Sequence, residues 1–152
     1  MIRYSSEVTI ARPPHAVYEA LLDPGLYPRW TDMVDVAFDG TGEARVGTRG
    51  RFRLAKGPIK GMLEMELTEL DPDRRVVFTV THPSLDWKAV STLEPSGTGT
   101  RLTYAGELRM RGWRRLLEPL AAREVRDGEA SEAVRLKALL ESTPEGSVPP
   151  GP

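Results

Sequence analysis

The sequence predicts an α+β domain in which one curved, seven-stranded antiparallel sheet wraps around a long C-terminal helix, with two short helices between the first two strands. Three observations support this fold class. Residues 2–10 and six segments within 34–110 alternate apolar and polar side chains with a period of two, which is typical of half-buried strands. Residues 13–30 carry short helical patterns instead. Residues 113–142 lose the alternation and are rich in the strong helix formers Leu, Ala, Glu and Arg.

The N-terminal part predicts one strand followed by two short helices. Residues 2–10 place Tyr4 and Ile10 on the same side of a strand, and two consecutive prolines end it. A helix over residues 13–23 is favoured because Pro is preferred near the first helical position and a Pro-Gly pair follows. A one-turn element over residues 26–30 comes next.

Six further strands are expected between the short helices and residue 110. They are separated by turn-forming sequences such as Lys-Gly-Pro, Asp-Pro-Asp and Pro-Ser-Gly. Short turns join antiparallel neighbours, so the strands are expected to form a single meander. The expected strands are residues 34–38, 48–55, 59–70, 75–82, 86–94 and 101–110.

The C-terminal helix has an interrupted apolar stripe. Gly128 and Glu129 occupy positions where the stripe should continue, and Pro119 predicts a kink or break near the helix start. A helix of about 28 residues is about 42 Å long, so we expect it to lie across the whole face of the sheet. A twisted sheet diverges from a straight helix, which favours a gap between them. The stripe consists of Leu117, Ala121, Val125, Ala133, Leu136 and Leu140.

Composition limits the chemistry. The 152 residues fit one domain over residues 1–142, and the Pro- and Gly-rich residues 143–152 predict a disordered tail. The absence of Cys excludes disulfides, Cys-ligated zinc, iron–sulfur clusters and thiol catalysis. The two His, His15 and His82, have no metal-ligand spacing, so no metal or other cofactor is expected. The sequence contains no apolar membrane span or signal-peptide core, and we expect a soluble cytoplasmic protein.

Three segments carry a family resemblance: residues 8–30, with Val17-Tyr18 and Trp30, the turn over residues 95–101, and residues 136–141. They resemble the START-like (SRPBCC) superfamily, which includes polyketide cyclases and dehydrases and the birch-pollen allergen type. The resemblance covers about residues 2–142. It implies a helix-grip fold with a deep, largely apolar cavity for lipids, polyketides or aromatic compounds, and no universal catalytic residue.

Binding or transport of a hydrophobic small molecule between sheet and helix is therefore the expected function. A polyketide cyclase or dehydratase is one alternative, with His82 and Tyr104 as the candidate acid/base pair. The second alternative is a protein-partner module that contacts a ribosome or a membrane complex. His82 also fits a solvated rim position at the end of its strand. The expected ligand-binding residues are Trp30, Phe52, Met65, Phe78, His82, Trp87, Ser91, Tyr104, Leu108, Leu117, Ala121 and Val125.

Arginine accounts for 17 of the 21 basic residues, although the net charge is only −1. One cluster, Arg109, Arg111, Arg114 and Arg115, has few acidic neighbours and predicts a peripheral contact with anionic head groups or phosphates. Nucleic-acid binding is disfavoured because aromatic and basic residues do not interleave as in nucleic-acid modules. The sequence does not determine the ligand or the oligomeric state.

Overall fold

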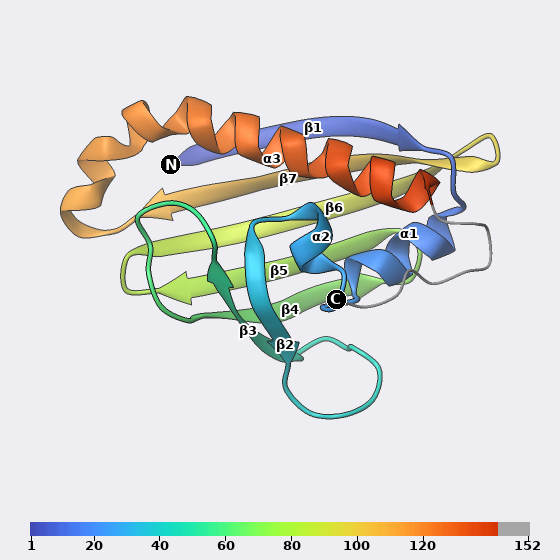
Figure 1. Ribbon diagram of the computed structural model, residues 1–152, viewed down its shortest axis with the longest axis horizontal. Helices are drawn as coiled ribbons and strands as arrows, with labels where there is room; N and C mark the ends of the chain where they lie inside the picture. Colours follow the sequence, from blue (N-terminus) through green and yellow to red (C-terminus); the bar gives the residue numbers. More distant parts are fainter. Residues whose placement is uncertain (143–152) are drawn as a thin grey trace.

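The computed structural model describes residues 1–142 and confirms the predicted α+β architecture (Figure 1). The predicted tail over residues 143–152 lies outside the described residues. The strands are β1 (Ile2–Ile10), β2 (Met33–Phe38), β3 (Arg49–Leu54), β4 (Leu63–Asp71), β5 (Arg75–His82), β6 (Leu85–Ser96) and β7 (Gly99–Met110). The helices are α1 (Pro14–Leu21), α2 (Tyr27–Trp30), the 3-10 helix η1 (Gly112–Leu117) and α3 (Glu118–Glu141).

The seven strands form one antiparallel sheet in the order β1-β7-β6-β5-β4-β3-β2. The strands from β2 to β7 follow one another as a meander, as their short turns predict. The N-terminal strand instead pairs with the last one, where Ile2 lies opposite Leu108. The register shifts between Leu67 and Glu69 where β4 pairs with β5, and such a bulge increases the local bend of a sheet.

The predicted C-terminal helix is broken near its start. Residues 112–117 form η1, and the α-helix begins only at Glu118. Pro119 lies in the first turn of α3, where its missing N–H removes no helical hydrogen bond. The break predicted at Pro119 is therefore confirmed.

The predicted strand over residues 59–70 starts too early. In the structure β4 begins at Leu63, and the preceding residues form an irregular loop. Gly57 and Gly61 have φ values of +93° and +85°, which lie in the left-handed region and interrupt an extended strand. Ile59 is nevertheless buried in the core, so its apolar character reflects packing of the loop.

The helix α3 does not cover the whole face of the sheet, contrary to the expectation from its length. It contacts β1, β7 and α2, while α1 contacts β5, β6 and β7 (Figure 1). Ala133, Leu136 and Leu140 on the C-terminal half of α3 are buried in the core. No helix within residues 1–142 is both long and apolar enough to cross a membrane.

Candidate functional site

A tyrosine and two carboxyl groups meet between the sheet and α3. Tyr104 is central on β7, lies opposite Ser91 of β6 and is only 2% exposed. Its hydroxyl donates a hydrogen bond of 3.1 Å to Oε1 of Glu132, which is itself buried. Glu129 precedes Glu132 by almost one helical turn, so both carboxyls project from the same side of α3.

Burial controls the protonation of this cluster. Loss of hydration raises the pKa of Glu132, and the charge of neighbouring Glu129 raises it further. Burial also raises the pKa of Glu129, while a hydrogen bond with Tyr104 partly opposes this shift. Arg135 and Asp32 form an ion pair of 3.6 Å beside them, with opposite effects on both carboxyls. The carboxyl pair therefore retains protons at pH values where exposed carboxyls have lost them.

Two polar atoms beside Tyr104 have no hydrogen-bond partner in the described part of the chain. They are Oε2 of Glu129 and Nε1 of Trp30, and both are buried. The Trp30 and Tyr104 rings make an edge contact with their centroids 5.8 Å apart. Leaving a buried polar group unpaired costs about 1–3 kcal/mol, so such atoms mark positions where a water or a ligand atom binds.

A second hydrogen bond extends the cluster across three strands. Nε1 of Trp87 on β6 donates to the hydroxyl of Tyr4 on β1 at 2.9 Å. Gly106 of β7 lies opposite Tyr4, and a Cβ there would be 2.3 Å from the Tyr4 hydroxyl oxygen. The absence of a side chain at Gly106 therefore lets the Tyr4 phenol cross β7 to reach Trp87.

The apolar residues around Tyr104 enclose a void of about 10 Å³. This is about the space that one water molecule requires. The deep cavity implied by the family resemblance is not formed around these residues, because aromatic side chains fill the space. The void is lined by Leu21, Tyr27, Trp30, Thr31, Met33, Val76, Phe78, Ser91 and Tyr104.

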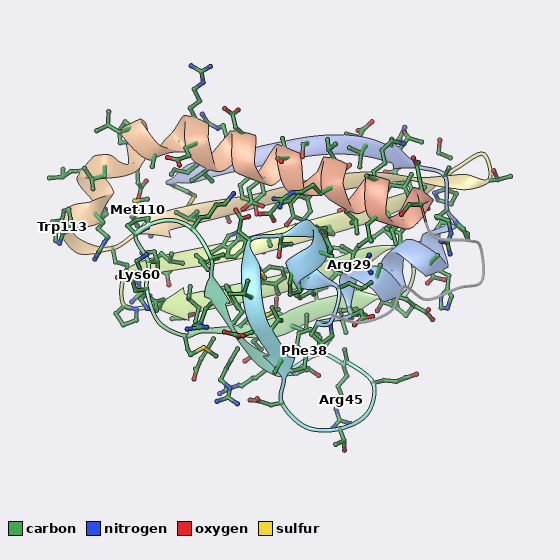
Figure 2. The ribbon with its side chains drawn as sticks, in the orientation of Figure 1. Arg29, Phe38, Arg45, Lys60, Met110 and Trp113 are labelled. Atoms are coloured by element: carbon green, nitrogen blue, oxygen red, sulfur yellow. The ribbon has the colours of Figure 1, made fainter. Side chains whose placement is uncertain are left out.

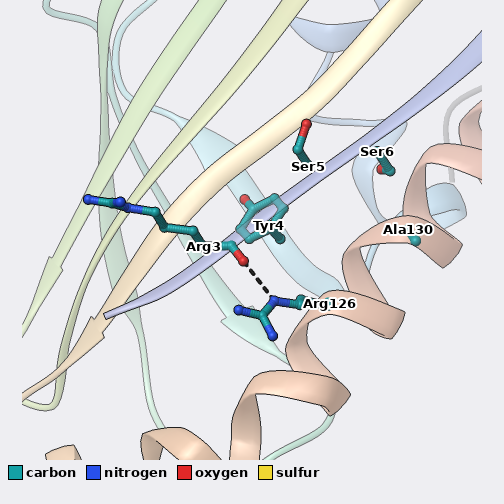
Figure 3. A pocket seen from close by; sticks show the side chains of 6 residues that line it. All are labelled: Arg3, Tyr4, Ser5, Ser6, Arg126 and Ala130. Carbon is teal, nitrogen blue, oxygen red and sulfur yellow. Dashed lines mark hydrogen bonds between the residues drawn. The ribbon is translucent and has the colours of Figure 1, made fainter.

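A surface groove of about 310 Å³ lies between β1 and α3 (Figure 3). Nε of Arg126 donates a 2.9 Å hydrogen bond to the backbone carbonyl oxygen of Arg3 within it. Ser5, Ser6 and Ala130 also line the groove, as does Tyr4, whose hydroxyl binds Trp87 inside the molecule. Tyr4 therefore connects the groove with the buried cluster.

Many residues predicted to bind a ligand share this interior. Phe52 and Phe78 make edge contacts with the Trp87 ring, and Met65 is buried on the same face of the sheet. Trp30, Phe78, Ser91 and Tyr104 surround the small void. Four of the predicted ligand-binding residues are half-buried: His82, Leu108, Ala121 and Val125.

Leu117 does not belong to the buried stripe of the helix. Its side chain is 40% exposed, and it lies in η1, before α3 begins. A 3-10 helix has three residues per turn, so the phase expected from α-helical spacing does not carry through it. Leu117 therefore lies outside the buried interior that the other predicted ligand-binding residues line or border.

His82 and Tyr104 do not form the predicted acid/base pair. Tyr104 is level with Ser91 and Val76 across the sheet, whereas His82 lies six residues farther along β5. At about 3.3 Å per residue, this offset is about 20 Å, beyond hydrogen-bond reach. Nδ1 of His82 accepts a 3.0 Å hydrogen bond from the backbone N–H of Ser84 at the end of the strand.

The sequence prediction missed Glu129, Glu132 and Tyr4 as site residues. The relevant signal is the interruption of the apolar stripe at Gly128 and Glu129, which favours a gap between helix and sheet but does not by itself identify a polar cluster. A Glu at an apolar stripe position, followed three residues later by another Glu, places two carboxyls on the buried side of the helix. Tyr4 lay on the apolar side of the first strand, without a sign of its hydrogen bond to Trp87.

Comparison with solved structures gives relatives of the same fold. TTHA0849 from Thermus thermophilus has a TM-score of 0.73 and 20% identity, covering 92% of this chain and 97% of that one. MLL2253 from Mesorhizobium loti has a TM-score of 0.71 and 22% identity, with coverages of 93% and 98%. DynU16, a protein in the dynemicin biosynthetic locus, has a TM-score of 0.69 and 18% identity, covering 93% of this chain but 48% of that one.

At these identities the likeness establishes the fold alone. Comparison with curated proteins gives no match. The family described as "Polyketide cyclase / dehydrase and lipid transport" matches residues 1–141, nearly all of the described chain. The chain belongs to this polyketide cyclase / dehydrase and lipid transport family.

Proposed function

We propose that the protein binds a hydrophobic small molecule, such as a lipid, polyketide or aromatic compound, between its sheet and α3. The observation that carries the proposal is the pair of unpartnered buried atoms, Oε2 of Glu129 and Nε1 of Trp30, beside Tyr104. An apolar interior with a few convergent polar groups is typical of small-molecule sites. Membership of a family that includes lipid transport supports the same class of ligand.

The polar groups favour a neutral ligand with both a hydrogen-bond donor and an acceptor. Oε2 of Glu129 accepts a hydrogen bond when this carboxyl is ionised, and the indole N–H of Trp30 donates one. An anionic group beside Glu129 and Glu132 would raise the cost of ionising these carboxyls further. A hydroxyl or secondary amine on an aromatic or aliphatic body meets these requirements.

Ligand entry requires the side chains around the 10 Å³ void to separate. The apolar residues Ala121 and Val125 in the first half of α3 are only half-buried, and polar contacts of Glu118 hold its first turn. The second half is anchored by buried Leu136 and Leu140. Fewer buried apolar contacts make the first half the easier part to displace. Its displacement would widen the groove at Tyr4 toward the buried cluster.

A cyclase or dehydratase activity is a second candidate function. The raised pKa of Glu132 favours its protonated form, which is a proton donor facing an apolar interior. An enzyme of this kind would lose turnover on Glu132→Gln while keeping much of its ligand affinity, because glutamine preserves shape but cannot transfer the proton.

The binding proposal is tested with the neutral fluorophore N-phenyl-1-naphthylamine, which has an aromatic body and an N–H donor. We expect saturable binding at one probe per chain, with energy transfer from the buried Trp30 and Trp87. Ala130→Trp places a large ring in the groove and should weaken binding or slow association by about tenfold, equivalent to about 1.4 kcal/mol. Native mass spectrometry of the protein from its own cells would then identify a co-purifying ligand.

Ala138→Trp is the matched control, because Ala138 lies on the same helix but is exposed outside the groove. It should leave probe affinity unchanged. A linear fluorescence rise without saturation would contradict an interior site. Equal effects of Ala130→Trp and Ala138→Trp would instead contradict entry between β1 and α3.

A further inference from the structure

An apolar stripe at the start of the C-terminal helical region faces outward. The four large apolar residues of this stripe fall within eight positions, from η1 into the first turn of α3, and such residues are normally buried: Trp113, Leu116, Leu117 and Leu120. Leu116 and Leu120 are instead 82% and 81% exposed, and Trp113 is 67% exposed. No described part of the chain covers these side chains.

The stripe lies at one extremity of the molecule. Figure 1 shows η1 and the first turn of α3 projecting beyond the ends of the strands, and Figure 2 places Trp113 at this tip. A depression of about 910 Å³ adjoins it, with Trp113, Leu116 and Pro119 among its lining residues. A projecting tip can approach a broad, flat partner without interference from the rest of the domain.

Four arginines surround the stripe. Within residues 1–142, Arg109 and Arg115 have no close ion pair and attract Asp86 and Glu118, respectively, only through longer-range charge interactions. Arg111 is paired with Asp86 through a 2.9 Å hydrogen bond from Nε. The Arg114 guanidinium lies 5.0 Å from the centroid of the Trp113 ring, where it stacks on the aromatic face.

The one acidic residue between positions 109 and 120 is already occupied. Glu118 binds the Met1 amino group through Oε1 and accepts a 2.8 Å hydrogen bond from the Met110 N–H through Oε2. Strand β3 is also rich in arginine, but acidic side chains neutralise its charge. Arg49 pairs with Glu66, and Arg53 pairs with Asp35. The tip therefore carries positive charge that acidic side chains do not neutralise, whereas the charge of β3 is neutralised.

This combination fits an anionic lipid surface. Trp and Arg are favoured at the level of lipid head groups, and Leu inserts into the acyl boundary. Basic residues near an anionic membrane strengthen binding by electrostatic attraction to the lipid phosphates. A two-fold contact with a second copy would instead bring the same four arginines together, which costs energy by like-charge repulsion. Nucleic acid would pair with the arginines but would leave the leucines uncovered.

We propose that residues 109–120 dock on the surface of anionic lipid bilayers, with Trp113, Leu116 and Leu120 inserted and the arginines on lipid phosphates. Docking through this stripe requires no ligand in the interior of the domain. Docking would hold the depression beside Met1 and Pro119 against the bilayer surface.

Sedimentation with vesicles tests the proposal. We expect at least tenfold more binding to equimolar phosphatidylcholine–phosphatidylglycerol vesicles than to pure phosphatidylcholine, and loss of that difference at high salt. Vesicles with bromine-labelled acyl chains should quench Trp113, since Trp30 and Trp87 are only 2% and 8% exposed. Combined Leu116→Ser and Leu120→Ser should reduce binding by about tenfold. Folding of this variant is checked by circular dichroism and should be unchanged, because both side chains are exposed.

Val46→Ser is the matched control, because Val46 is 60% exposed on a different loop. It should bind the mixed vesicles like the parent protein. Absence of binding to the mixed vesicles would overturn the proposal, as would equal binding by the double variant. A concentration-dependent dimer that the double variant abolishes, without vesicle binding by the parent, would assign the stripe to a second copy.

Discussion

The hydroxyl of Tyr104 on β7 donates a 3.1 Å hydrogen bond to Oε1 of Glu132 on α3, joining the middle of the sheet to the helix that packs on it. Both side chains are buried, so the contact is shielded from water. Glu129 and Trp30 place two further polar atoms without described partners beside this contact. The interior of the domain is therefore a packed apolar core that contains buried polar atoms without hydrogen-bond partners.

Tyr104→Phe should lower the free energy of unfolding by about 1–3 kcal/mol, because it removes the hydroxyl that donates to buried Glu132. Urea denaturation measures the change. Tyr18→Phe on α1 is the control, since Tyr18 is only half-buried, and it should change stability by less than about 0.5 kcal/mol. Similar losses for the two variants would show that the Tyr104–Glu132 hydrogen bond contributes little to stability.

Stability should fall as the pH rises above the usual carboxyl value of 4.5. The folded-state pKa of Glu132 is raised by burial and then by Glu129, so the folded protein holds a proton that the unfolded chain releases. This loss of stability is absent below the pKa that the Glu132 carboxyl has in the unfolded chain. It is complete above the pKa of Glu132 in the folded protein. Its slope is at most about 1.4 kcal/mol per pH unit for each proton retained.

Glu132→Gln should flatten this decline, because glutamine is neutral at every pH. Thermal unfolding followed from about pH 5 to about pH 9 measures the slope. Glu124→Gln, at an exposed position on the same helix, should keep the slope of the parent protein. If Glu132→Gln keeps it as well, the carboxyl of Glu132 does not carry the linkage.

Gly128→Ala should stabilise the protein by about 0.5–1 kcal/mol, because alanine is favoured over glycine inside a helix. A Cβ at Gly128 meets no atom within 4 Å, and its φ is not in the left-handed region. Differential scanning calorimetry should show a rise of about 1–4 °C in Tm. Gly112→Ala should act oppositely, since Gly112 has a φ of +63°. A lower Tm for Gly128→Ala would mean that α3 requires a glycine there.

The secondary-structure elements and the fold class follow from local patterns in the amino-acid sequence. Alternation with a period of two placed Tyr104, Trp87 and Phe78 on the inward face correctly, because neighbouring side chains in a strand necessarily point to opposite faces. Pro119 predicted the break before α3, since a proline ring clashes with the carbonyl group one helical turn before it. These are local properties, and local properties can be derived from a single sequence.

Which side chains meet depends on how the elements are placed relative to one another. His82 and Tyr104 share an inward face but are separated along the strands by the register, which depends on hydrogen bonding between β5, β6 and β7. Glu129 looked like a gap in an apolar stripe until the position of α3 along β1 and β7 brought the helix carboxyls to Tyr104. The energies of such contacts depend on the relative placement of whole elements, and side-chain periodicity within one element carries no information about that placement.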